Sequence, residues 1–398
     1  MPATSSSLSV LRRAATTAQM PARRLSAVDS STLLRALEAV PDPRQRRGRR
    51  HPLHSMLCLA LGAVLAGADS WAAIADWAAV TDHDVSRGRR PPHASTFRRL
   101  LGRVDAAALE AALTGWVLGR RDTAARQAAG SPVAERRMVL AADGKTLRGA
   151  QQPDGSQTKL FCLYDHAHCL VLAQTPVLDG DEIAAFTTAL AALPDLSEVV
   201  ITADALHCQR AHARWLHERG GHYLFTIKAN QPTLRRAVAA LPWGQVSGSR
   251  RRQAGHSRTE SRSIKVVDLD GHPIQALFPH AQRAIKVVRR RRDRRTGKRS
   301  VETVYAVTSL DYRHADPGLL AVWIQGHWGV ENRVHHVRDV TQSEDRSRIR
   351  AGSGPHVLAT LRNTALNLHR LDGHTNIARA QRRTAWRAGA ALQTINAA

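Results

Sequence analysis

The sequence predicts an α/β protein: a mixed sheet with helices on both faces, interrupted by a β-rich insertion and preceded by an all-α N-terminal domain. Three observations support this prediction. Residues 136–230 show the order strand, strand, strand, helix, strand, helix, strand. Short strand-like segments divided by turns fill residues 231–308, and helical periodicity dominates 28–126 and 317–398. Such an order implies one mixed sheet with covering helices, because sequential strands and then alternating units must share a core.

The N-terminal part contains several predicted helices. Residues 1–27 are rich in Ser, Thr, Ala and Arg, and we expect a disordered basic tail. The next helix, STLLRALEAV, has Ser31 as its candidate N-cap. The apolar run that follows, Leu53 to Ala68, is short for a membrane span and contains a histidine, so we expect Leu53 to Ala66 to form a buried helix. Residues 127–135 are the predicted linker to the α/β part.

A pair of helices in this domain has the outline of a helix-turn-helix DNA reader. Ser70 is placed to cap WAAIADWAAV, and Ser95 to cap the basic helix after PPHA. That second helix is predicted to contain the DNA-contact candidates Arg98, Arg99 and Arg103. Any small helical domain produces such a pair, so the pattern alone leaves a purely structural role open.

The charge balance favours a nucleic-acid partner. The chain has 58 Lys+Arg against 33 Asp+Glu, a net charge of +25, and a pI near 11.4. Most of the excess is arginine, which suits bidentate phosphate contacts. A loop at 44–52 and a predicted hairpin at 289–299 concentrate this charge. The alternatives are a high-GC genome, which encodes Arg heavily, and a solvated linker at 44–52.

The four cysteines do not indicate a zinc site. Cys58, Cys162, Cys169 and Cys208 form no C-x-x-C pair and have no zinc-ligand spacing. This excludes a zinc deaminase or another zinc hydrolase. Free thiols are typical of a reducing compartment, so we expect a cytoplasmic protein.

One stretch, HWGVENRVHHVRDV, is predicted to form a helix that presents charged side chains. Glu331, His335 and Arg338 lie at i, i+4 and i+7 and therefore share one face of an α-helix. Val330, Val334 and Val337 form an adjoining apolar stripe. The alternative is a surface Glu–Arg pair on an ordinary amphipathic helix.

Two aspartates make a site at this helix the stronger interpretation. Asp143 is predicted at the end of the first strand and Asp204 at the end of the fourth. These strands lie side by side at the centre of a sheet with this order, and the helix after the insertion can bring Glu331 to the same place. Three converging carboxylates need a compensating cation, and oxygen ligands favour Mg²⁺ or Mn²⁺. Two such ions support phosphoryl transfer.

Several blocks of the chain resemble one family. The sequence from about residue 30 to residue 380 is similar to the insertion-sequence transposases of the ISAs group, which include the H-repeat-associated proteins. The resemblance implies a ribonuclease H-like core with an Asp-Asp-Glu triad, here Asp143, Asp204 and Glu331, and a β-rich insertion before the glutamate. It also implies DNA cleavage and joining, and a synaptic homodimer or larger assembly. The blocks are DGKTLRGA, ITADALHCQ, GGHYLFTIKANQPTL, HWGVEN, ATLRN and DVTQSEDRSRIR.

The chain departs from the Tyr–Arg–Glu–Lys signature of related transposases. Ile324, His327 and Arg338 stand at the Tyr, Arg and Lys positions, and His336 replaces a usual tryptophan. Arginine can still contact phosphate, whereas Ile324 cannot. Lys145 either contacts phosphate or neutralises Asp143. The further predicted DNA contacts are Lys228, Arg338, Arg289, Arg290, Arg291 and Arg292.

Other acids and bases near the triad have predicted minor roles. Asn332 and Asp339 flank the catalytic face and are expected to tune the metal shell. Glu344 and Asp345 are rival third acids, ranked lower because they lie beyond the predicted helix end. His207 is expected to cap or pack rather than to bind metal.

Two other functions remain open from the sequence. One is the product of a degraded element that binds DNA without catalysis, and the other is a metal-dependent nuclease that does not join strands. The presence of all three acids argues against the first, while the sequence does not separate the second from a transposase.

Overall fold

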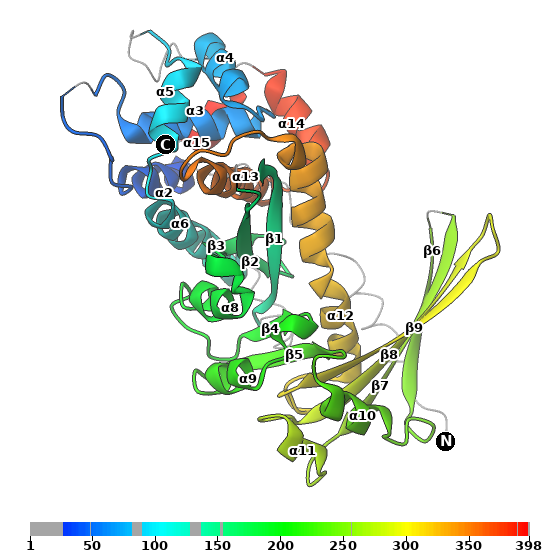
Figure 1. Cartoon of the computed structure of the whole chain (residues 1–398). Coiled ribbons are helices and arrows are strands. Elements are labelled where there is room, and N and C mark those ends of the chain that lie inside the picture. Colours follow the sequence, from blue (N-terminus) through cyan, green and yellow to red (C-terminus); the bar gives the residue numbers. More distant parts are fainter. Residues whose placement is uncertain are drawn as a thin grey trace.

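A computed structural model describes residues 27–47, 49–81, 90–127, 137–151, 154–255, 257–387 and 389–396. Three sequence-predicted features lie outside these ranges: residues 1–26 of the basic tail, the turn of the proposed helix-turn-helix, and nearly all of the linker at 127–135. The described chain combines a large mixed sheet with many helices, and the helices from the two ends of the chain gather together (Figure 1).

The N-terminal helices pack around one very apolar helix, α3. All but two of the residues of α3 are buried, as expected for a sequence that is apolar on every side. Helices α2, α13, α14 and α15 pack against it, so the first and last parts of the sequence share one core. The N-terminal elements are α2 (Ala27–Glu38), α3 (Leu53–Leu65), α4 (Trp71–Thr81), α5 (Ala94–Leu101) and α6 (Ala106–Gln127).

The helix ends confirm one predicted cap and correct two others. Ser70 Oγ accepts the Ala73 N–H at 3.2 Å, as predicted. Helix α2 already begins at Ala27, so Ser31 lies inside it. His93, not Ser95, caps α5: its Nδ1 accepts the Ser95 N–H at 3.2 Å, because the helix starts two residues earlier than expected. Arg103 lies beyond the end of α5 at Leu101.

The sheet has nine strands in the order β3-β2-β1-β4-β5-β9-β8-β7-β6. Strands β1 and β4 are parallel neighbours, as are β4 and β5, while every other pair is antiparallel. This confirms the predicted mixed sheet and the adjacency of its first and fourth strands. The first five strands are β1 (Val139–Gln151), β2 (Gln157–Asp165), β3 (Val171–Pro176), β4 (Val200–Ala203) and β5 (His222–Ile227).

The segment after β5 extends the same sheet. Strand β9 pairs with β5, and β8, β7 and β6 follow outward, so the predicted β-rich insertion continues the central sheet (Figure 1). The predicted basic hairpin is β8–β9. Strand β6 is exposed along its whole length and was not expected. The elements are α10 (Pro232–Ala239), β6 (Gly248–Gly255), β7 (Arg258–Asp268), α11 (Ile274–Leu277), β8 (Arg283–Asp293) and β9 (Arg299–Thr308).

Helices and 3₁₀ turns link the strands and close the chain. Helix α12 starts at the cap Asp316, whose side chain accepts the Leu319 N–H, with Pro317 in its first turn. It continues without a break into η3 and η4, which are π-helical. The linking and C-terminal elements are η1 (Leu178–Gly180), α8 (Glu182–Leu190), η2 (Ala205–His207), α9 (Arg210–His217), α12 (Pro317–His327), η3 (Val330–His335), η4 (Val337–Thr341), η5 (Glu344–Arg346), α13 (Gly354–Leu371), α14 (Ile377–Ala385) and α15 (Ala390–Asn396).

Helix α13, whose sequence HVLATLRNTALNLHR predicts an amphipathic helix over residues 356–370, is instead buried on nearly every side. It lies between the N-terminal helices and the edge strand β3. Asn367 accepts the Val171 N–H at 2.9 Å and donates to the Val171 carbonyl at 2.7 Å, which satisfies the open edge of the sheet. Among the described helices, none combines the length and the apolar character that crossing a lipid bilayer requires.

Candidate active site

The strand register brings the two aspartates together. Ala142 on β1 is paired across the parallel ladder with Ala203 on β4, so Asp143 and Asp204 occupy the next position on each chain. Asp204 follows the end of β4, as predicted. Asp143 does not end its strand, since β1 runs on to Gln151. Gly144 follows it, and a Cβ there would overlap the Glu182 carboxylate, which would have to move aside.

Glu331 reaches the same place because α12 lies very close to the sheet. A Cβ on Gly329 would come within 2.9 Å of the Tyr164 ring, so only glycine permits this approach. Val330 and Val334 are fully buried against Tyr164 and its neighbours, which confirms the predicted apolar stripe and fixes the first π-turn.

His335 joins two of the three acids in one compact group. Single ligand atoms of Asp143, Glu331 and His335 all lie within 4.8 Å of one another. His335 Nδ1 is 3.7 Å from Asp143 Oδ2 and 3.5 Å from Glu331 Oε2. Asp204 lines the same cavity, and its Oδ1 accepts the Leu206 N–H at 2.9 Å. Sequence reasoning placed His335 on the right face of its helix but assigned it no role.

Burial and mutual repulsion dominate the electrostatics of this group. Burial, and then the charges of Glu331 and Asp204, raise the pKa of Asp143 to about 8. The pKa of Glu331 is lowered, chiefly by its interaction with the nearby His335 side chain. Burial lowers the pKa of His335, which favours the neutral imidazole, the form that binds metals. Carboxylate oxygens and a neutral imidazole are suitable ligands for a divalent ion.

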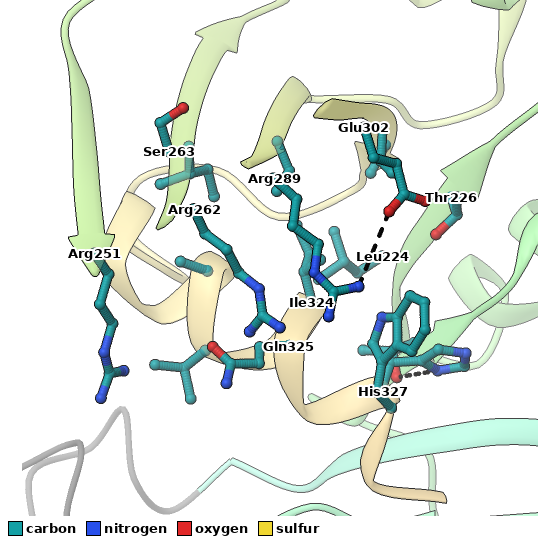
Figure 2. Close-up of a pocket in the computed structure, with 18 of the residues that line it drawn as sticks. Leu224, Thr226, Arg251, Arg262, Ser263, Arg289, Glu302, Ile324, Gln325 and His327 are labelled. Atoms are coloured by element: carbon teal, nitrogen blue, oxygen red, sulfur yellow. Dashed lines mark hydrogen bonds and ion pairs between the residues drawn. The ribbon is translucent and has the colours of Figure 1, made fainter. Parts of the chain in front are cut away.

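The three acids open on a cavity of about 910 Å³ between α12 and the extended sheet. Figure 2 shows the side chains of Arg251, Arg262 and Arg289 reaching from β6, β7 and β8 into this space. Trp328, half exposed, lines the cavity near Glu331, with the Arg289 guanidinium 5.4 Å from its ring centre. Arg250 and Arg251 were missed from the sequence because GSRRRQAG lacks the apolar alternation that indicates a strand. Arg262 was missed because it lies in the polar first half of β7, RTESRS, which lacks that alternation too.

Arg338 does not face this cavity, which contradicts its prediction as a phosphate contact. It is fully buried and donates to both Glu344 oxygens, at 2.9 and 2.8 Å. The cause is the π geometry: each turn holds more residues than an α-turn, so seven positions after Glu331 the side chain points elsewhere. Glu344, the rival third acid, is neutralised there by Arg338 and Arg362 and does not line the cavity.

Lys145 also belongs to that interior, where it is paired with carboxylates other than Asp143. Its ammonium lies 2.5 Å from Asp339 and 3.8 Å from Glu344, and only 7% of the residue is exposed. Asp339 is thus the ion-pair partner of Lys145. Asn332 is exposed and donates to the Trp328 carbonyl. Asp345 lies 3.7 Å from Arg148 and does not line the cavity.

The other predicted DNA contacts lie in three places. Lys228 lines the cavity and is exposed. Arg289 lines it while paired with Glu260 at 2.7 Å, and Arg291 also approaches Glu260. Arg290 and Arg292 are exposed but do not line the cavity, because successive residues of β8 point to opposite faces. Arg98, Arg99 and Arg103 are exposed on the helical domain. For Arg98, Arg99 and Arg103, contact with DNA stays a prediction, whereas the position of Arg290 and Arg292 argues against contact with DNA held in the cavity.

His207 packs as expected rather than joining the acids. It is 1% exposed, lies between Phe161 and Phe186, and its Nε2 is 3.4 Å from Glu182. His327, at the signature's arginine position, has its Nδ1 3.1 Å from Thr202 Oγ1 at the edge of the cavity (Figure 2).

Comparison with known proteins identifies the class as transposases. Residues 134–368, more than half of the chain, match the family described as "Transposase DDE domain", and residues 34–117 match "DDE_Tnp_1-associated". The chain therefore belongs to the transposase DDE domain family. This confirms the resemblance found in the sequence.

Bacterial relatives support the same assignment. The chain is 27% identical to "Putative transposase YncI" of Escherichia coli O157:H7, over 85% of this chain and 87% of the relative. It is 26% identical to "H repeat-associated putative transposase YhhI" of Escherichia coli K12, over 84% of this chain and 89% of the relative. An uncharacterized protein from the dhlA 3′ region of Xanthobacter autotrophicus is 34% identical, over 58% of this chain and 79% of the relative.

Proposed function

We propose that the protein is a DNA transposase that cuts at insertion-sequence ends and joins the freed 3′-hydroxyl to target DNA. The observation that carries this proposal is one cavity that contains Asp143, Asp204 and Glu331 together with arginines from three strands. The strand order β3-β2-β1-β4-β5 is the one we expect of a ribonuclease H-like core, with β6–β9 as its insertion.

A divalent ion fits the acid group. Burial and the charges of Glu331 and Asp204 raise the pKa of Asp143, which a bound cation would offset, while Lys145 and Arg338 are paired with Asp339 and Glu344. Asp143, Asp204 and Glu331 would hold Mg²⁺ or Mn²⁺. When bound, two such ions activate the attacking oxygen and stabilise the leaving oxygen of a phosphoryl transfer.

The basic residues of the cavity supply the DNA-binding surface. Arg250, Arg251 and Lys228 are exposed at its wall, where guanidinium and ammonium groups contact phosphates without reading sequence. The phosphodiester backbone is thereby held against the acids on the opposite side. Because two element ends must be brought together, we expect a homodimer or larger assembly, acting in the cytoplasm.

Metal-dependent cleavage and joining of a labelled duplex that carries the element's own flanking end tests this proposal. Wild type is compared with Asp204→Ala and Glu331→Gln, with Arg290→Ala as a control outside the cavity. We expect joining by wild type and the control, and loss of joining with retained DNA binding in the two acid variants. Cleavage without joining would favour a nuclease, and binding without chemistry under either metal would indicate a degraded element.

A further inference from the structure

We propose that His335 is a direct ligand of the divalent-ion site, which would then combine carboxylate oxygens with one imidazole nitrogen. This inference rests on the proposed function, because it concerns the same ion. It goes beyond the three acids, since it assigns a fourth side chain and a metal preference to the site.

The position of the imidazole supports ligation. His335 Nδ1 faces both Asp143 and Glu331, at 3.7 and 3.5 Å, within a group whose ligand atoms span at most 4.8 Å. These separations exceed ordinary hydrogen-bond lengths and suit three atoms arranged around one cation. The residue is 5% exposed, so it does not turn away into solvent.

The far side of the ring is held by a partner that accommodates either tautomer. His335 Nε2 lies 3.6 Å from Cys162 Sγ, and Cys162 stands directly opposite Asp143 in the β1–β2 ladder. A thiol both donates and accepts hydrogen bonds weakly, so Nε2 can keep its proton while Nδ1 offers a lone pair. Metal-bound histidines are normally oriented in this way by a partner on the second nitrogen.

A nitrogen ligand changes which ion the site prefers. Sites built only from oxygen suit Mg²⁺, whereas imidazole favours first-row transition metals. The site should therefore bind Mn²⁺ more tightly than Mg²⁺. His327 lines the same cavity but does not belong to the compact group, since its Nδ1 lies 3.1 Å from Thr202 Oγ1.

Pulsed electron paramagnetic resonance of Mn²⁺ bound to the full chain tests this ligand directly. A coordinated imidazole gives a ¹⁴N coupling, which ¹⁵N-histidine labelling replaces without any substitution. We expect the coupling in wild type and in His327→Gln, and its loss in His335→Gln. The preference for Mn²⁺ over Mg²⁺, measured by competition, should fall by about tenfold or more in His335→Gln.

A second control separates this site from another group in the described chain. Glu198, His222 and His314 also bring ligand atoms within 4.8 Å of one another, so His222→Gln is measured in parallel. Bound Mn²⁺ without nitrogen coupling in wild type would overturn the role of His335 and leave the acid site standing. Coupling that persists in His335→Gln and disappears in His222→Gln would also overturn it. No Mn²⁺ binding at all would count against the proposed function itself.

Discussion

The same π-helical segment contributes Glu331 to one acidic cluster and Arg338 to another, and the two clusters are built in opposite ways. The cavity cluster is Asp143, Asp204 and Glu331. The interior cluster is Glu344, which is 2% exposed and is bound by Arg338 and Arg362. Burial alone would raise the pKa of Glu344, but the two arginines outweigh it and lower that pKa to about 2, whereas the pKa of Asp143 rises to about 8.

This difference distinguishes a carboxylate with a structural role from one that is placed to bind a ligand. The carboxylates of both clusters lose hydration on folding. In the interior cluster, ion pairs with the guanidinium groups of Arg338 and Arg362 offset the free energy of desolvation. In the cavity cluster, Asp143 and Glu331 instead face the His335 imidazole, and the cluster opens to the outside. A bound ion, or protons when no ion is present, would relieve the repulsion between its acids.

Disrupting the interior cluster should cause the largest loss in the free energy of unfolding. Arg338→Met removes one partner of Glu344 and leaves a poorly compensated buried charge, so we expect the free energy of unfolding to fall by about 3–5 kcal/mol. Denaturant titration measures this. The control Arg290→Met, at an exposed position of β8, should change it by less than about 0.5 kcal/mol. Equal effects of the two substitutions would contradict the account of the interior cluster.

The two clusters should respond to pH in opposite directions in metal-free buffer. The pKa of Asp143 in the folded protein lies above its ordinary 3.8. Its contribution to the free energy of unfolding is therefore fully present below pH 3.8 and is lost as pH rises toward 8. Wild type should therefore lose stability relative to Asp143→Asn between pH 5 and 7, by at most about 1.4 kcal/mol per pH unit.

Glu344 has the reverse dependence. The pKa of Glu344 in the folded protein lies below the ordinary 4.5. Its contribution to the free energy of unfolding is therefore fully present above pH 4.5 and is lost as pH falls toward 2. The stability advantage of wild type over Glu344→Gln should shrink between pH 4.5 and 3, as measured by denaturant titration. A constant advantage across that range would show that the arginines do not hold this carboxyl ionised.

Adding a divalent ion should stabilise only through the cavity cluster. At a hundred times the dissociation constant, Mn²⁺ should raise the free energy of unfolding by about 2.7 kcal/mol, because it binds the folded state alone. Asp143→Asn should abolish most of this gain. Thermal unfolding with and without Mn²⁺ measures it, and an equal gain in both proteins would place the ion elsewhere.

The smallest expected effect concerns the arginines that line the cavity. Arg251→Ala should weaken DNA binding equally for all sequences and lower the slope of log K against log salt by about one unit. Arg290→Ala, on the other face of the insertion strands, should leave the slope unchanged. Filter-binding at several salt concentrations distinguishes them, and the same slope change in both would mean that DNA does not follow the cavity.

The sequence predicted the parts of the site that depend on strand order. Periodicity alone placed Asp143 and Asp204 on neighbouring strands, because that order has few topological solutions. Arg338 was misplaced because the direction of a side chain depends on helix geometry, and π-turns shift every residue after Glu331. Lys145, on β1, was misplaced because its partner Asp339 comes from that same π-helical segment. Burial of α13 on all sides depends on contacts from both ends of the chain, which local patterns do not contain.

The most direct test compares one acid from each cluster in the same reaction. Mg²⁺- or Mn²⁺-dependent cleavage of the element's end is measured for wild type, Glu331→Gln and Glu344→Gln, each corrected for its folded fraction. We predict that Glu331→Gln loses about a thousandfold, roughly 4 kcal/mol of transition-state stabilisation, while Glu344→Gln stays near wild type. Full activity in Glu331→Gln, or an equal loss in Glu344→Gln, would contradict the assignment of the cavity acids as the catalytic site.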